Sequence, residues 1–406
     1  MSFLKEFPGK QTLLELYNAE YDDSALKVNN HIHTPYSFSA FDSVTEAIEM
    51  ALEEEVKILG INDFYVADGH EEFMNSCNTN GIFPLLNMEL IGVSPDDQAK
   101  GIRINDPKNP GRIYISAKGL AFPFQLDEKY APILENIVNG SNAQVITMIS
   151  LLNRWMEKQG VEFQLSAKEI KENYAMNLLR ERHVARRLRL MLDKVQDDKD
   201  YREKLKDLYG GKASLTNRKN IAHTEDELRS NLLKAGSPAF VPEDESAFLP
   251  LKEITELIRS TGAVPCYPML LDGAGEEMTE FEESKEKLIA ELDKHGFTCV
   301  ELIPLRNDLA VLREYAVYFY KNGFVVSFGT EHNTSELIPL TVTAKGGVEL
   351  DEELSQISFN GAAWQAAHQY MLAKEGFGYN KKGREEMEIL GKAILYYYFN
   401  TLFTKK

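Results

Sequence analysis

The chain has 406 residues, of which 43% are apolar and 27% are charged, and a formal net charge of −18. This composition is that of a globular protein and excludes a disordered or fibrous chain. The acidic charge argues against broad binding to nucleic acids or anionic membranes, because both need a positive surface that faces phosphates.

The N-terminal extension, residues 1–26, and the cysteines indicate an intracellular protein. Lys5 and Glu6 lie where a secretory signal would have an apolar run, and no stretch reaches the ~18–20 apolar residues of a membrane span. The three cysteines are too far apart for a disulfide framework or a CxxC metal site. We therefore expect a cytoplasmic protein with no membrane partner.

Amphipathic helices alternate with short, continuously apolar strands along much of the chain. Gly262, Gly296 and Gly323 end three of these helices, as expected of a residue that closes a helix in the left-handed conformation. Continuous apolar strands indicate burial on both faces and hence a parallel sheet, closed into a barrel or left open. The strands are expected at residues 27–33, 57–61, 83–92, 112–117, 263–267, 297–303 and 324–328, and four helices at 44–56, 251–260, 284–295 and 308–322.

Two regions depart from this alternation. Residues 126–247 are mostly helical and rich in charge, with surface or lid helices expected at 145–158 and 167–207. After Pro339 we expect a β segment at 340–350 and helices at 362–374 and 383–401. The expected organisation is an extension at 1–26, a barrel at 27–335 with a helical insertion at about 126–247, and a C-terminal extension at 336–406 that packs on the barrel.

Polar residues fall at the ends of the predicted strands, where a (β/α) barrel carries its chemistry. His31 and His33 project on the same face of one strand and can share a metal ion, or else hydrogen bond to the backbone as a buried pair. If the barrel closes, carboxylates and imidazoles converge at one mouth, a donor set that suits Zn, Mn or Fe. The converging residues are His31, His33, Asp63, Glu89, Glu331 and His332. Asp63 alone is equally well explained as a turn cap.

Several motifs, in order, resemble the PHP (polymerase and histidinol phosphatase) family, most closely its nucleotide-phosphoesterase type. VNNHIHTPYS resembles the opening His-x-His-Thr motif, LGINDFYVADGH the second motif, and GIFPLLNMELIGV the third segment with its Glu. RERHVARRL resembles the Arg-x-His-[IV]-Ala helix of the family, STGAVPCYP its Ala-His-Pro strand end, and VVSFGTEHNT its Gly-Ser-Asp-x-His. These matches span roughly residues 28–335.

The resemblance implies a distorted (β/α)7 barrel whose mouth binds up to three divalent metal ions and hydrolyses phosphoesters. It implies His31, His33, Glu89 and Glu331 or His332 as metal ligands, and Asp63, Glu89 and His332 as catalytic residues. A small anionic, phosphorylated substrate would contact Arg182 and His183. Arg112 and Tyr267 are expected to bind it too, because each puts a hydrogen-bonding group where the family has a metal ligand, and with His332 they would form the anion pocket of a metal-free site.

The sequence departs from the family at several ligand positions. Phe38 or Ser39 stands at the third ligand of the opening motif, Phe64 replaces the His of the second motif, and Tyr267 replaces the His of Ala-His-Pro. Arg112 or a neighbour falls where another family His precedes a strand. Because Phe cannot coordinate a cation, we expect fewer than three ions, with a mononuclear site or a metal-free anion pocket as the two alternatives.

Two functions follow from these alternatives. The first is a divergent metal-dependent phosphoesterase or related hydrolase with a reduced metal site. The second is a PHP-like pseudoenzyme that binds an anion without catalysis. A nucleic-acid-acting polymerase subunit is disfavoured by the acidic charge and the lack of a polymerase segment after the barrel. The aromatic run at residues 393–403 is expected either to pack on the core or to form a contact in a homo-oligomer.

Overall fold

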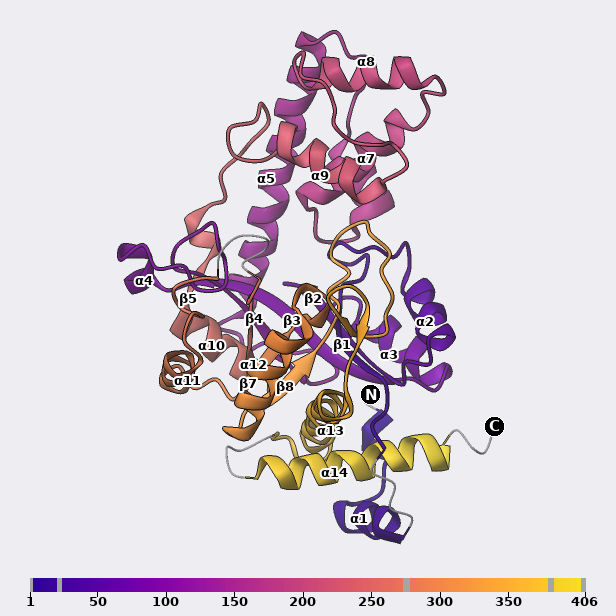
Figure 1. Cartoon of the computed structure of the whole chain (residues 1–406), viewed down its shortest axis with the longest axis vertical. Helices are drawn as coiled ribbons and strands as arrows, with labels where there is room; N and C mark the ends of the chain where they lie inside the picture. The colour runs from indigo at the N-terminus through magenta and orange to yellow at the C-terminus, as the bar shows by residue number, and fades with distance from the viewer. Residues whose placement is uncertain (1–2, 20–23, 273–277, 379–382, 403–406) are drawn as a thin grey trace.

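The computed structural model describes residues 3–19, 24–272, 278–378 and 383–402, which fold around a barrel-like sheet (Figure 1). Seven strands form its wall in the order β1-β2-β3-β4-β6-β7-β8, and a short strand, β5, pairs with β3. Their bounds are Val28–Ile32 (β1), Ile58–Phe64 (β2), Phe83–Val93 (β3), Arg112–Lys118 (β4), Leu249–Pro250 (β5), Val264–Pro268 (β6), Cys299–Leu302 (β7) and Val325–Phe328 (β8). The seven predicted barrel strands are confirmed.

The first and last strands bring the barrel close to closure. Ile32 and Glu331 form a parallel bridge, in which His33 N donates to Glu331 O at 2.8 Å and Glu331 N donates to His31 O at 2.9 Å. The approach depends on Gly329, because a Cβ at this position would lie 2.2 Å from the Cβ of His31. The backbone that carries the predicted His-x-His pair is therefore tied directly to the segment after β8.

Strand β4 corrects the expectation of a wholly parallel sheet. It runs antiparallel to both of its neighbours, with Lys118 opposite Asn87 of β3 and Val264 of β6. Burial on both faces gives a strand a continuous apolar pattern whatever its direction, so the pattern did not reveal the reversal. The link from β3 to β4 contains only the five-residue helix Pro95–Ala99 (α4), and such a link joins neighbouring strands without a long helical crossover.

Five helices cover the outside of the sheet, four of them where the alternation predicted a helix and a fifth, at residues 70–79, that was not predicted. Ser43 caps the first of these helices, its side chain accepting a hydrogen bond from Glu46 N. Each helix turns an apolar face to the strands. The covering helices are Val44–Glu53 (α2), His70–Thr79 (α3), Leu251–Ser260 (α10), Lys285–Lys294 (α11) and Leu309–Lys321 (α12).

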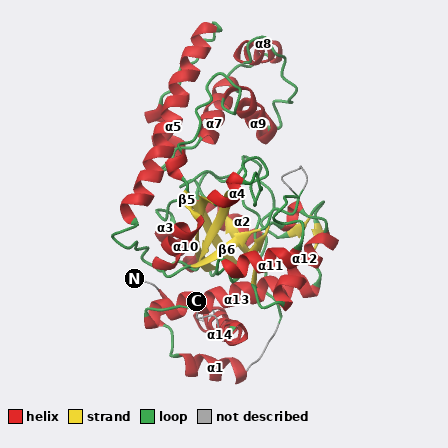
Figure 2. Ribbon diagram, turned by 90° about the vertical axis from the view of Figure 1, so that its left-hand side faces the viewer, coloured by secondary structure: helices red, strands yellow, loops and turns green. Residues whose placement is uncertain are grey.

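The insertion forms a helical block with its own hydrophobic core on one side of the sheet (Figure 2). The helical stretch expected over residues 167–207 contains three α-helices and a π turn, and the chain leaves the helical conformation at Met176, whose φ is 45°. Arg186 docks the block onto the barrel by donating to Ser39 O at 2.5 Å. The helices are Ala131–Lys158 (α5), Ala167–Ile170 (α6), Glu181–Leu192 (α7), Asp198–Leu208 (α8) and Ile221–Leu232 (α9), with the π turn at Lys171–Ala175.

The C-terminal helices lie on the opposite side of the sheet from the insertion (Figure 2). The first, Glu352–Glu375 (α13), begins earlier than expected because Asp351 caps it by accepting from Leu354 N. It passes so close to β8 that a Cβ on Gly361 would lie 2.0 Å from Val326 O. The second, Arg384–Tyr397 (α14), packs against α13 and the N-terminal helix Lys10–Ala19 (α1).

Smaller elements complete the fold. The expected β segment after Pro339 is an antiparallel pair, Thr343–Ala344 (β9) and Val348–Glu349 (β10). The aromatic run packs with the N-terminal and C-terminal helices, which is one of the two alternatives expected for it. The packed residues are Tyr396, Tyr397, Tyr398 and Phe399, and Phe403 lies outside the described residues. No helix within the described ranges is long and apolar enough to cross a membrane.

Candidate metal centre

Three of the predicted ligands converge inside the barrel. His31 lies near the end of β1, His33 directly follows that strand, and Glu89 lies in β3. All three side chains are buried. His31 Nε2 lies 3.2 Å from His33 Nε2, and Glu89 Oε2 lies 3.2 Å from His33 Nε2 and 3.8 Å from His31 Nε2. Among the described residues this is the group of histidines, cysteines and carboxylates close enough to share an ion.

The geometry of this triangle fits one divalent ion. Metal–ligand bonds of about 2.0–2.2 Å in a tetrahedral site place ligand atoms about 3.4 Å apart, close to the three separations seen here. The buried Oδ1 of Asn62, whose Nδ2 lies 2.9 Å from His31 Nε2, has no hydrogen-bond partner in the described part of the chain. A buried oxygen left unpaired beside two imidazoles and a carboxylate is what an ion or its water would satisfy.

The position of His31 is fixed by groups that sequence reasoning missed. Its Nδ1 lies 3.0 Å from Glu301 Oε2, and Glu301 also accepts from Lys118 Nζ at 2.5 Å. A carboxylate on the far nitrogen of a histidine sets the tautomer and turns the other nitrogen toward a metal. The available signal was a Glu in the apolar run FTCVELI and a Lys at the end of IYISAK, since a buried charge needs a partner.

The position of His33 is fixed through Ser37 and Asp63. Ser37 Oγ lies 3.1 Å from His33 Nδ1 and donates to Asp63 Oδ1 at 2.5 Å. Asp63 also accepts from Thr34 N at 2.7 Å and from Thr34 Oγ1 at 2.5 Å. These contacts are those of a turn cap, the alternative considered for Asp63, and they hold the loop after His33 rather than presenting the carboxylate to the triangle.

Burial and neighbouring charges shift the pKa values of these groups. Burial raises the pKa of Glu89 to about 7 and that of Asp63 to about 6. Burial lowers the pKa of His33 well below its usual value, with the neighbouring His31 adding to the effect. Burial is the largest single influence on the pKa of His31 and lowers it, but the charge and hydrogen bond of Glu301 and the charge of Glu89 together outweigh burial, so the net shift is upward. The neutral His33 is ready to act as a ligand, since only the unprotonated nitrogen binds a metal.

The two residues expected from the last strand stay outside the triangle. His332 uses both ring nitrogens elsewhere: Nδ1 lies 2.7 Å from Thr330 Oγ1 and Nε2 lies 2.8 Å from Ile338 O. Its ring stacks on Phe41 at 4.8 Å between centroids. Glu331 contributes its backbone to the closure of the barrel, and its side chain lies 3.7 Å from Arg306. Both have positive φ, which turns this segment sharply after β8.

Arg112 and Tyr267, expected as substrate-binding residues, have partners of their own. Arg112 NH1 lies 2.5 Å from Glu243, and its guanidinium lies 4.1 Å from the centre of the Phe248 ring. Tyr267 is fully buried and donates to Glu282 Oε1 at 2.8 Å. The structure does not bring either side chain into the triangle.

The insertion places arginines over the mouth. Arg180 lies over the ring of Phe64, 4.9 Å from its centre, and Phe64 in turn lies 5.0 Å from His33. Arg182 faces Phe38 at 5.8 Å. In the part of the chain that the structure describes, neither guanidinium has a carboxylate within 4.0 Å, although the charges of Asp226 and Glu181 act on Arg182 from further away. Arg182 was among the predicted residues and Arg180, at the start of the same motif, was not.

His183 lies beneath these arginines at the start of α7. Its Nδ1 accepts from Arg180 N at 2.9 Å, and its ring meets Phe38 edge-on at 5.0 Å. Burial lowers the pKa of His183 well below its usual value, so the ring is neutral and its Nε2 carries the proton. That buried N–H has no acceptor among the described residues.

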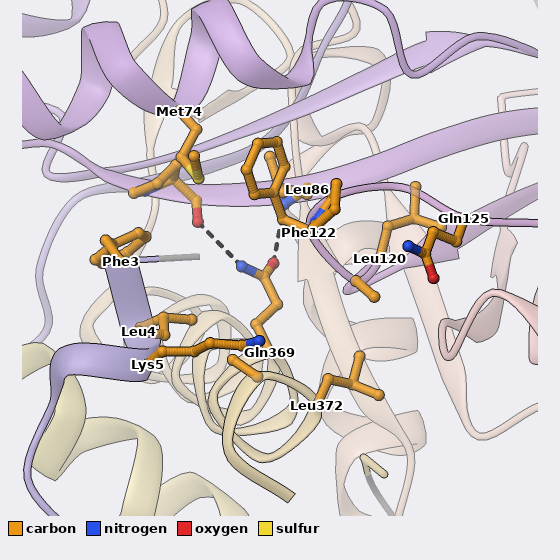
Figure 3. A pocket seen from close by; sticks show the side chains of 14 residues that line it. Phe3, Leu4, Lys5, Met74, Leu86, Leu120, Phe122, Gln125, Gln369 and Leu372 are labelled. Atoms are coloured by element: carbon orange, nitrogen blue, oxygen red, sulfur yellow. Dashed lines mark hydrogen bonds between the residues drawn. The ribbon is translucent and has the colours of Figure 1, made fainter. Parts of the chain in front are cut away.

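Two cavities lie beside the barrel. The larger, about 760 Å³, runs between the loop after β2 and α5, and Tyr65, Phe124, Leu134 and Asn177 are among its lining residues. The smaller, about 210 Å³, lies between α13, β3 and the N-terminal residues, with Gln369 bonded to the backbone of β3 at its wall (Figure 3). Neither cavity has any residue of the triangle in its lining.

The comparison with known families agrees with this geometry. Residues 29–209 match the family model of the PHP domain, a stretch that includes His31, His33, Glu89 and the arginines of α7. The expected resemblance to the PHP family is confirmed. No protein with a curated function matches the chain in sequence.

Two solved structures are similar to the chain. A provisionally assigned metal-dependent phosphoesterase from Bifidobacterium adolescentis aligns over 83% of this chain and 96% of its own, with 14% sequence identity and a TM-score of 0.54. An amidohydrolase from Chromobacterium violaceum, with bound sulfate and no metal, aligns over 78% of this chain and 94% of its own, with 14% identity and a TM-score of 0.46. The first of these supports the PHP-type fold.

The positions at which the chain departs from the PHP motifs are filled by packed aromatic rings. Phe38 is buried between His183 and Arg186, whose guanidinium lies 4.5 Å from the ring centre. Ser39, the other candidate for the third ligand of the opening motif, donates to His33 O at 2.8 Å. The PHP-like mouth of this chain therefore combines one compact ligand triangle with an apolar surround.

Proposed function

We propose that the protein is a metal-dependent phosphoesterase that works with a single divalent ion, Zn, Mn or Fe, held by His31, His33 and Glu89. The observation that carries the proposal is the triangle of two imidazole nitrogens and one carboxylate oxygen, with sides of 3.2, 3.2 and 3.8 Å. Catalytic sites of this kind use three protein ligands and keep a further position open. The ion would supply Lewis-acid polarisation of a phosphoryl oxygen and a water of lowered pKa.

The residues around the triangle supply the binding of a phosphorylated substrate. Arg180 and Arg182, which have no carboxylate partner, would hold phosphate oxygens through charge-assisted hydrogen bonds. The Nε2–H of His183 offers one more donor on the same side. These cations give the mouth a positive field within an acidic protein, so the net charge of −18 does not oppose a small anionic substrate.

The remaining predicted residues receive supporting roles in this proposal. Asp63 and Ser37 orient His33, and Glu301 orients His31, which keeps both Nε2 atoms aimed at the ion. His332 and Glu331 hold the segment that closes the barrel against β1. Asn62 Oδ1 is placed to accept from a water or substrate hydroxyl beside the ligands.

Metal analysis of the purified protein tests the proposal. We expect about one divalent ion per chain after reconstitution with Zn, Mn or Fe, and none in the His31→Ala/His33→Ala variant. His223→Ala, at an exposed histidine on α9, serves as the matched control and should retain the ion. A wild-type protein that holds no ion after reconstitution with each metal would overturn the proposal.

Activity is tested with a panel of phosphomonoesters and phosphodiesters. Glu89→Gln should lower turnover by more than about 100-fold, because loss of a direct ligand exceeds the 10–100-fold typical of groups behind the ligands. Turnover that is unchanged in Glu89→Gln would place the activity elsewhere. Metal binding without turnover of any ester would favour the second candidate, an anion-binding module, which the packed rings of Phe38 and Phe64 support.

A further inference from the structure

A lysine and a glutamate form an ion pair in the middle of the barrel, next to the ligand triangle. Lys118 is 1% exposed and Glu301 is 0% exposed, and the Nζ to Oε1 distance is 2.5 Å. Lys118 Nζ also donates to Asn30 O at 2.9 Å. Burial of two charges is costly, so a pair that persists here needs a function or a dense set of further partners.

Glu301 has such partners on both oxygens. Oε2 lies 3.0 Å from His31 Nδ1 and accepts from Ser116 Oγ at 3.0 Å. Oε1 accepts from Lys118 at 2.5 Å and from Ser327 Oγ at 3.5 Å. Both oxygens are therefore committed, and Glu301 stands behind His31 instead of entering the triangle.

The charges explain why Lys118 is needed for this arrangement. Glu89 Oε2 lies 3.8 Å from His31 Nε2 and Glu301 Oε2 lies 3.0 Å from His31 Nδ1, so without Lys118 two buried carboxylates would face the same imidazole. Lys118 Nζ contacts the other oxygen of Glu301, Oε1, at 2.5 Å and compensates the charge of that carboxylate. Lys118 thus pairs with Glu301, one of the two carboxylates, and the other carboxylate, Glu89, is left to bind the ion.

We propose that Lys118 is a positioning residue of the metal centre, which pairs with Glu301 and thereby keeps that carboxylate as the hydrogen-bond partner of His31 and out of the coordination of the ion. This inference rests on the proposed function, because it requires an ion at His31, His33 and Glu89. It assigns opposite effects to the two members of the pair. Lys118 repels the ion and restrains Glu301, whereas Glu301 attracts the ion and orients its ligand.

Zn²⁺ titration calorimetry on the full chain tests the assignment, with three variants that form a double-mutant cycle. Lys118→Met removes the cation and frees Glu301, so its zinc affinity should rise by about tenfold. Glu301→Gln leaves the cation unpaired, so its zinc affinity should fall by about tenfold or more. Lys118→Met/Glu301→Gln removes both charges and should return close to the wild-type affinity.

The sign of the effects separates positioning from a merely structural role. A structural pair would lose affinity in all three variants, and that result would overturn the inference while leaving the proposed function intact. If Lys118→Met alone does not fold, Glu301→Gln is compared with the double variant, in which removal of the cation must still raise the affinity. A wild-type protein that binds no zinc would overturn the inference together with the proposed function, and this result is visible before any variant is compared.

Discussion

The barrel buries two polar clusters that differ in how their hydrogen-bonding atoms are paired. Toward α13, the side-chain amides of Asn30, Asn87 and Gln365 pair donor with acceptor: Asn30 Nδ2 donates to Gln365 Oε1 at 2.8 Å, and Gln365 Nε2 donates to Asn87 Oδ1 at 2.5 Å. At the ligand triangle, two imidazole nitrogens and a carboxylate oxygen face one another instead. The side chains of the amide cluster pair donor with acceptor among themselves, whereas the triangle brings three atoms together that could hold a metal ion.

This difference separates a structural network from a functional site within one core. A fully paired buried network stabilises a unique arrangement, and a set of acceptors brought together is destabilising unless a cation or protons join them. Three changes probe the contrast, beginning with the one expected to have the largest effect.

The arginines over the mouth should matter for substrate and not for the fold. Arg180→Ala/Arg182→Ala removes two cations that lie outside the ion pairs of the described residues, so we expect kcat/KM for a phosphoester to fall by about 100-fold or more. Metal content should be unchanged. Steady-state kinetics with metal analysis checks this, and Arg202→Ala, at an exposed arginine on α8, is the control. A loss of metal together with activity would contradict the separate roles assigned to arginines and triangle.

A change in the amide cluster should lower the stability of the fold and leave the metal centre unaffected. Gln365→Leu leaves Asn30 Nδ2 and Asn87 Oδ1 each without one partner inside the barrel, so the free energy of unfolding should fall by about 1–3 kcal/mol. Urea unfolding measures the loss, and Glu375→Leu at the exposed end of α13 provides a matched polar-to-apolar change. Zinc affinity should stay at its wild-type value. A large fall in affinity would show that the two clusters act as one.

A buried carboxyl that forms no ion pair with the described residues gives the smallest effect for each pH unit, seen as a dependence of stability on pH. Burial raises the pKa of Glu282 to about 8, although Leu270 N and Tyr267 OH donate to it. The folded protein therefore holds this proton more tightly than the unfolded chain. The stability linked to it is complete below the unfolded pKa and is lost as the pH rises through about 8, by at most about 1.4 kcal/mol per pH unit.

Glu282→Gln should remove this dependence. Urea unfolding at pH 6, 7 and 8 should show wild type losing stability relative to the variant as the pH rises. Parallel curves would mean that Glu282 has the same proton affinity in both states. The result sharpens the contrast with Glu301, whose pKa lies at about 2 because Lys118 pairs with it.

Much of the fold was predictable because local patterns carry it. The seven strands and four of the five helices that cover them were found from apolar runs, amphipathic patterns and helix-ending glycines, since each element must bury a face that its sequence already displays. The helical character of residues 167–207 was predicted, but the breaks that divide this range into three α-helices and a π turn were not. The predicted direction of β4 was wrong, because burial sets its composition and its connection sets its direction.

The candidate site was only partly predictable. His31, His33 and Glu89 were identified from strand-end positions and from motifs that resemble those of the PHP family, and the structure brings the three together. Three other predicted residues have suitable side chains but are engaged by partners elsewhere. His332 hydrogen bonds to Ile338 O, Tyr267 hydrogen bonds to Glu282, and Arg112 forms an ion pair with Glu243. Whether a polar side chain is free for function depends on which partners lie within reach, and those partners are distant in the chain.

The sequence by itself determined the order of strands and helices, the acidic surface and the metal-binding residue types at two strand ends, because these depend on composition and short-range spacing. The tertiary structure decided which of those residues meet. The pairing of Lys118 with Glu301, 183 positions apart, and the placing of Arg180 over Phe64 follow from closure of the barrel and docking of the insertion. Long-range contacts of this kind are set by how buried faces pack together, which no local pattern records.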